Sequence, residues 1–180
     1  RIRIFKRTYR GHRQRSSAMN PSIELRIRTM IRALTESIIP AVDPENSLAQ
    51  EQANLLLGHL HVLLQHEGRE KTMCDVEQAD LKQLAGALVE ASSGGSMTAA
   101  ATARVRNLPD GTDTDTLSHA IEALIIDSGI DGSEAFKCSC DTLVLEHARD
   151  ATLRSRIWFK SMGFDHDPDA LPDIDLLLPG

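Results

Sequence analysis

Aromatic residues are scarce in this sequence, with one Trp, one Tyr and four Phe among 180 residues. Leu and Ala carry much of the apolar content instead, and they favour helices, whereas aromatic and β-branched residues favour strands. Three cysteines are too few for a disulfide scaffold. No apolar run approaches the ~20 residues that span a bilayer, so we expect no membrane-spanning helix. With 41% hydrophobic and 26% charged residues, the composition excludes disorder of the whole chain.

Complete catalytic motifs are also missing from the sequence. We find no Gly-x-Ser-x-Gly nucleophile turn, no Gly-x-x-x-x-Gly-Lys phosphate loop and no Gly-x-Gly-x-x-Gly dinucleotide motif. We therefore predict no cofactor, assign no residue a catalytic role, and leave open whether the protein is an enzyme.

Charge is distributed unevenly along the chain. Residues 1–18 contain seven basic residues and no acidic one, which leaves 13 basic against 26 acidic residues over residues 19–180. We interpret residues 1–18 as a basic disordered arm, with an upstream extension, an organelle-targeting segment and a nucleic-acid contact as the alternatives. The strong negative charge of the remainder argues against nucleic acid as a partner.

The remaining sequence predicts helices. Helix-start signals at Asn20-Pro21 and Asp43-Pro44, the break at Pro40 and leucine-rich periodicity predict helices over residues 20–39, 43–68, 72–91, 117–129 and 131–162. Residues 92–116 form a long connection that contains a weak helical segment at 97–106. We predict an all-α fold, an up-down helical bundle of about five helices with one long crossover loop. The bundle domain covers residues 19–164, and residues 165–180 form an extended acidic tail.

Four polar residues are candidates for a binding site. His59 and His66 are seven residues apart and share one helix face, Gln52 lies in a polar patch at the start of the same helix, and His147 lies on the last helix. They predict a polar pocket in the bundle core, against the simpler alternative of exposed or hydrogen-bonded side chains. Because the Glu-x-x-His pairs of di-iron bundles are absent, we expect no metal site.

Two glycine-containing segments resemble functional loops. Residues 127–138 begin like an EF-hand loop, but Cys138 stands where the bidentate Glu is required, so we interpret the segment as a turn. Gly94-Gly95-Ser96 is interpreted as a flexible hinge or as a lid over a pocket.

Residues 38–66 (IIPAVDPENSLAQEQANLLLGHLHVLLQH) resemble a segment of uncharacterised all-helical bacterial proteins. The resemblance is carried by Pro40, Asp43, Pro44, Leu48, Gln50, Glu51 and Gln52. It implies a bacterial cytosolic helical protein, and implies no mechanism.

Leu55, Leu56 and Leu57 are consecutive, so apolar side chains face nearly all round the second helix. That helix is therefore either fully enclosed or part of an interface. We predict a cytoplasmic, non-enzymatic binding or interaction module that self-associates as a homodimer. The alternative is a small-ligand or metal-binding enzyme with a polar core pocket around His59 and His66, whose ligand the sequence does not identify.

Overall fold

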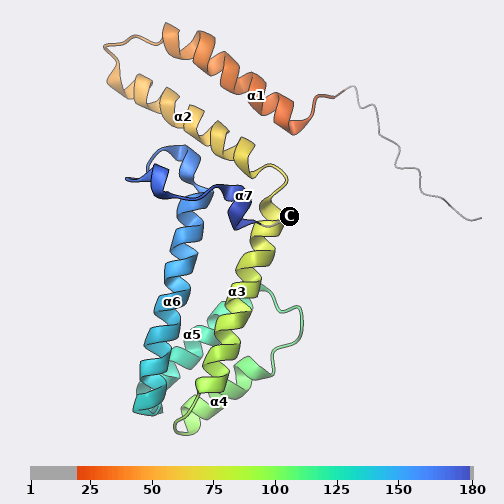
Figure 1. The fold of residues 1–180 in the computed structure, drawn as a ribbon, viewed down its shortest axis with the longest axis vertical. Coiled ribbons are helices and arrows are strands. Elements are labelled where there is room, and N and C mark those ends of the chain that lie inside the picture. Colours follow the sequence, from red (N-terminus) through yellow and green to blue (C-terminus); the bar gives the residue numbers. More distant parts are fainter. Residues whose placement is uncertain (1–19, 179–180) are drawn as a thin grey trace, which may run out of the picture.

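A computed structural model describes residues 20–178, and every regular element in this range is helical (Figure 1). The predicted all-α helical bundle is confirmed. The predicted basic arm, residues 1–18, lies outside the described residues. The α-helices are α1 (Ile23–Ala33), α2 (Ser47–His66), α3 (Glu70–Ala91), α4 (Ser96–Arg106), α5 (Thr114–Asp131), α6 (Glu134–Trp158) and α7 (Ile174–Leu177). Short π and 3-10 turns are η1 (Leu34–Ile38), η2 (Ile39–Ala41), η3 (Lys160–Met162) and η4 (Pro168–Ala170).

Helix starts follow capping side chains. Ser22, Asn46, Asp113 and Ser133 each accept a hydrogen bond from a backbone N–H in the first turn of α1, α2, α5 and α6. The first helix is thus capped by Ser22 and begins at Ile23, rather than being capped by Asn20 as expected. Helix α5 is longer than expected and continues past Gly129, because a lone glycine lowers helix stability without ending a packed helix.

The long connection between the third and fifth helices is ordered around α4. Thr98, Ala101, Thr102 and Val105 are buried there, and α4 packs chiefly against α5. The weak helical segment expected at 97–106 is therefore a helix that tertiary packing stabilises, as is usual for short helices.

The long helices α3 and α6 lie side by side, with α4 and α5 against one end of the pair and the α1–α2 hairpin across the other (Figure 1). The largest core lies between α3, α4, α5 and α6, around the fully buried Leu88, Leu124 and Phe136. A second core joins the start of α3, the end of α6 and the C-terminal segment, and a third lies inside the hairpin.

The α3–α4 and α5–α6 turns cross in close contact. Gly94 and Gly132 form an antiparallel bridge, and the Gly95 N–H donates to the Asp131 carbonyl oxygen at 2.8 Å. The Asp131 carboxylate accepts hydrogen bonds from the N–H groups of Met97 and Thr98, both at 2.9 Å. The segment that begins like an EF-hand thus uses Asp131 to cap α4, and the glycine pair expected to be a hinge is held in this crossing.

The C-terminal segment differs from the expected extended tail. Residues 168–170 and 174–177 are helical, and Leu171, Ile174 and Leu178 are buried against the start of α3 and the end of α6. Their apolar side chains stabilise the docked segment despite the surrounding aspartates.

Candidate functional site

The structure places three of the four predicted site residues along α2 with different surroundings. Gln52, His59 and His66 recur at seven-residue intervals, so they share one helix face. Gln52 is exposed, His59 is an exposed residue at the rim of a pocket, and His66 is buried. They do not converge on one cavity.

His66 connects the hairpin to the end of α6. Its ring stacks on Trp158, with centroids 3.7 Å apart and planes 15° from parallel. Its Nε2 lies 2.7 Å from the Trp158 carbonyl oxygen, so the Nε2–H tautomer donates to that oxygen. The Gln65 amide donates to the Trp158 and Ile157 carbonyls. Carbonyls in the last turn of a helix lack partners within the helix, so α2 supplies a cap for α6.

His147 lies in a separate groove between α3 and α6. Asp80, Glu146 and Asp150 line the same pocket, whose volume is about 160 Å³. Across residues 20–178, no group of three or more His, Cys, Asp or Glu side chains is arranged to hold a metal ion.

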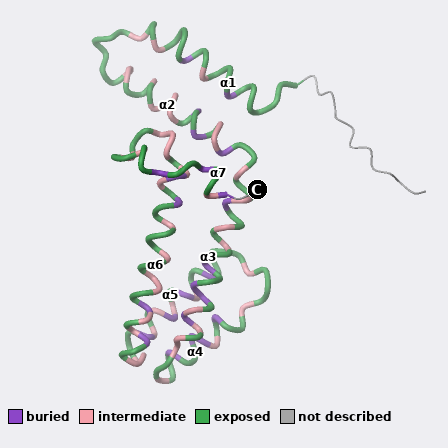
Figure 2. Tube along the Cα trace, in the orientation of Figure 1, coloured by how far each residue is buried: buried purple, intermediate pink, exposed green. Residues whose placement is uncertain are grey.

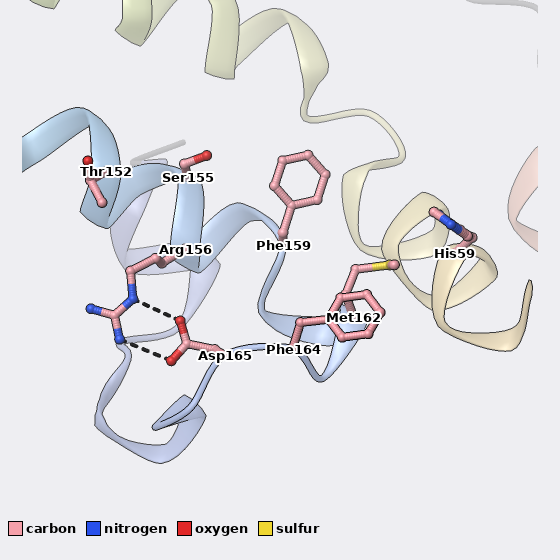
Figure 3. Close-up of a pocket in the computed structure, with 8 residues that line it drawn as sticks. All are labelled: His59, Thr152, Ser155, Arg156, Phe159, Met162, Phe164 and Asp165. Carbon is pink, nitrogen blue, oxygen red and sulfur yellow. Dashed lines mark hydrogen bonds and ion pairs between the residues drawn. The ribbon is translucent and has the colours of Figure 1, made fainter. Parts of the chain in front are cut away.

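A larger pocket, which we call the junction pocket, lies where α2, the end of α6 and residues 160–165 meet (Figure 3). Its volume is about 560 Å³, within the range of small-molecule sites. The lining residues are His59, Thr152, Ser155, Arg156, Phe159, Met162, Phe164 and Asp165. Phe159 and Phe164 are 51% and 71% exposed, which is unusual for phenyl rings and leaves apolar surface uncovered.

An ion pair holds one side of the junction pocket. The Arg156 guanidinium donates through Nε and Nη2 to both carboxylate oxygens of Asp165, at 2.8 and 3.0 Å (Figure 3). The Asp167 N–H also donates to Asp165 Oδ1. These hydrogen bonds, chiefly those from Arg156, hold the pKa of Asp165 well below its ordinary value and raise the pKa of Arg156. The bidentate pair fixes the position of the 163–167 turn.

This pair predicts a specific loss of stability in acid. A carboxyl group whose pKa is lowered by folding stabilises the protein above its unfolded pKa, near 3.8, and this contribution is lost as the pH falls toward the folded pKa. We expect Asp165→Asn to lower the thermal midpoint at pH 7, and the difference from the unsubstituted protein to shrink to less than half at about pH 2. Thermal scans at pH 7, 4, 3 and 2 test this. A difference that is constant with pH would contradict the prediction.

The α1–α2 hairpin carries a second candidate site, a surface of apolar side chains. Ile23 and Met30 of α1 are 63% and 47% exposed, and Leu56 and Leu63 of α2 are 51% and 54% exposed. Each pair is seven residues apart and therefore shares a helix face. We call these four residues the apolar flank.

Both halves of the apolar flank lie on the same side of the hairpin. Met30, Leu56 and Leu63 each directly precede a partly buried residue of the hairpin core: Ile31, Leu57 and Leu64. Residues 31, 57 and 64 lie in the contact between the two helices. In an antiparallel pair of right-handed helices, the residue directly before each contact residue points to the same side of the pair. The groove on the opposite side is lined mainly by polar residues: Arg28, Arg32, Thr35, Glu36 and His61, beside Ile31 and Leu64.

The hairpin buries few side chains of its own. Its core contains the buried residues Ile27, Leu34 and Leu60, and α1 is exposed along most of its length (Figure 2). Helix α1 packs chiefly against α2, which itself packs on η3 at the end of α6. Two helices joined by so small a core gain little stability from packing, so a further partner on the apolar flank would stabilise them.

Comparison with known proteins does not identify a function.

No family model matches the chain, and no match was found to a curated protein or to a solved structure. The resemblance of residues 38–66 to uncharacterised bacterial helical proteins therefore stays a prediction. No helix within residues 20–178 is long and apolar enough to cross a membrane.

The residues that form these two sites were only partly visible in the sequence. The breadth of apolar residues on α2 indicated a helix that is enclosed or part of an interface, and exposed Leu56 and Leu63 are consistent with the interface. The exposure of Phe159 and Phe164 around a pocket was not visible in the sequence, because it depends on how residues 160–165 turn back toward α2.

Proposed function

We propose that this protein is an interaction module that self-associates through the apolar flank of the α1–α2 hairpin. The observation that carries the proposal is the contrast between the two sides of the hairpin. Ile23, Met30, Leu56 and Leu63 are exposed on one side, whereas the other side carries the ion pairs Arg28–Glu24 and Arg32–Glu36. Exposed apolar surface of this kind on a protein marks a site of association.

A second copy of this chain is the partner that fits the flank. Two hairpins that meet through the same flank form a four-helix bundle around a two-fold axis, so one surface serves both partners. The 20 residues of α2 are about 30 Å long and the 16 residues of α1 and η1 about 24 Å. Each helix is about 10 Å wide, which gives roughly 540 Å² per copy. Both copies together approach the ~1,200 Å² at the lower end of stable interfaces.

The proposed function is non-enzymatic. It fits the sequence, which contains no nucleophile turn, phosphate loop or dinucleotide motif. A bacterial origin and a cytoplasmic location remain part of the proposal and rest on the resemblance of residues 38–66.

Substitution within the flank tests self-association. We expect Leu56→Gln/Leu63→Gln to weaken the dimer at least about 100-fold, because a symmetric interface loses four buried leucine side chains. Glutamine keeps the helix propensity close to that of leucine, so the hairpin itself should persist. Sedimentation equilibrium between 1 and 200 µM gives the dissociation constant, and circular dichroism checks the helix content.

Ile126→Gln/Leu145→Gln is the matched control. These side chains are 58% and 69% exposed on α5 and α6, away from the hairpin, and we expect the control to associate like the unsubstituted chain. A chain that is monomeric throughout this concentration range would overturn the proposal. So would a dimer that both double variants weaken equally.

A further inference from the structure

We propose that the junction pocket binds a small, uncharged aromatic molecule, one per chain. This inference does not rest on self-association, because none of the residues that line the pocket is one of the four residues of the apolar flank, although His59 lies one helix turn from Leu56 and Leu63. It also differs from the core pocket expected around His59 and His66. The His66 ring stacks on the Trp158 ring and its Nε2 is hydrogen-bonded to the Trp158 carbonyl oxygen, so His66 does not line the junction pocket.

The construction of the pocket favours a small molecule over a protein surface. Its walls come from three segments: His59 from α2, Ser155 from α6, and Phe159, Met162 and Phe164 from the C-cap of α6 and the turn that follows. By contrast, the grooves beside α1 and beside the outer face of α6 are each lined by one helix. A ligand in the junction pocket would therefore contact three segments at once, whereas a ligand in either of those grooves would contact one helix.

The lining chemistry selects an aromatic ligand. Figure 3 shows Phe159, Phe164 and Met162 between His59 on one side and the Arg156–Asp165 pair on the other. Phenyl rings stack or make edge contacts with a ligand ring, and a thioether adds a favourable contact with aromatic groups. A cavity of about 150 Å³ already holds benzene, so a pocket of about 560 Å³ accommodates two fused or linked rings.

The charges of the lining select an uncharged ligand. The Arg156 and Asp165 side chains neutralise each other in a bidentate pair, so the pocket has no free charge from these two groups to offset that of an ionic ligand. The Ser155 and Thr152 hydroxyls and the His59 imidazole supply hydrogen bonds at the edge of the apolar surface.

Titration with N-phenyl-1-naphthylamine tests the site. This uncharged two-part aromatic probe becomes fluorescent in an apolar site, and Trp158, adjacent to Phe159, is the single tryptophan and gives a second signal. We expect saturable binding with one probe per chain, and at least a 10-fold weaker affinity in Phe159→Ala/Phe164→Ala. Phe164 is largely exposed, whereas Phe159 is half-exposed and makes an edge contact with the His66 ring, so circular dichroism of the double variant checks that the fold is intact.

Three further variants make the result specific. Thr152→Phe introduces a larger side chain at an exposed position that lines the pocket and should weaken binding to a similar extent, whereas Ile126→Ala, on α5, should not change it. Leu56→Gln/Leu63→Gln should retain binding, even if self-association is lost. The inference is overturned if the probe does not saturate, if the two phenylalanine substitutions leave the affinity unchanged, or if the flank variant alone abolishes binding. The last outcome would place the probe on the apolar flank and leave the self-association proposal standing.

Discussion

Gly132→Ala is expected to lower the free energy of unfolding by about 2–3 kcal/mol, the cost of overpacking a closely packed site. An added Cβ at Gly132 would stand 2.4 Å from the Ser128 carbonyl oxygen and 3.0 Å from the Ser128 Cα. Both are backbone atoms at the end of α5, so relief of the overlap requires the helix end or the turn to move. The backbone angle φ of −66° at Gly132 suits any residue, so the loss reports the overlap and not a conformational preference.

Two other glycines provide the control for this prediction. Gly86 in α3 and Gly129 in α5 have open space where a Cβ would stand. Alanine at either position should raise stability by about 0.5–1 kcal/mol, because glycine is a poor helix former. Urea unfolding of the three single variants gives the comparison. If Gly132→Ala proved as stable as Gly86→Ala, the Ser128 backbone near the end of α5 would not lie as close to Gly132 as described.

Asp80→Ala is the second substitution with a large expected effect. Arg154 on α6 is buried, with 7% of its surface exposed, and its guanidinium donates to the Asp80 carboxylate on α3. Removal of Asp80 leaves a buried positive charge without its partner, which typically costs 3–5 kcal/mol. Because the Asp80 side chain is about one-third exposed, solvent compensates in part, and we expect a loss of about 2–3 kcal/mol.

The double variant Asp80→Leu/Arg154→Met distinguishes the loss of the ion pair from the cost of leaving the Arg154 charge unpaired. Apolar residues of similar size replace both charges, and such replacements are often neutral, so most of the stability lost in Asp80→Ala should return. Glu36→Ala breaks the exposed Arg32–Glu36 pair and should change stability by less than about 0.5 kcal/mol. Chemical denaturation of all three variants provides the measurement. A double variant as unstable as Asp80→Ala would show that the charged pair itself is required.

Local signals along the chain were sufficient to locate most of the helices. The apolar periodicity of residues 23–38, Pro40 and the turn at Gly68 depend on neighbouring residues, so they are readable without the fold. Helix α4 gave a weak signal because its small residues form a stable helix only when they pack against α5. The docked C-terminal segment was underestimated for a related reason, since its leucines are stabilised by surfaces of α3 and α6 that are far away in sequence.

The sequence also determined the candidate residues of α2 but not their roles. Seven-residue spacing places Gln52, His59 and His66 on one face in any helix. Which of them meets water, a pocket or Trp158 depends on where the end of α6 lies, and this is a tertiary contact.

The few aromatic residues also show which properties the sequence determines and which depend on the tertiary structure. By itself the sequence determined that leucine and alanine would form the core of an all-α protein, because composition and periodicity act locally. Only the tertiary structure decided that Phe136 is fully buried while Phe159 and Phe164 remain exposed around a pocket. The reason is that exposure depends on which other segments cover a side chain, and those segments are brought together only when the chain folds.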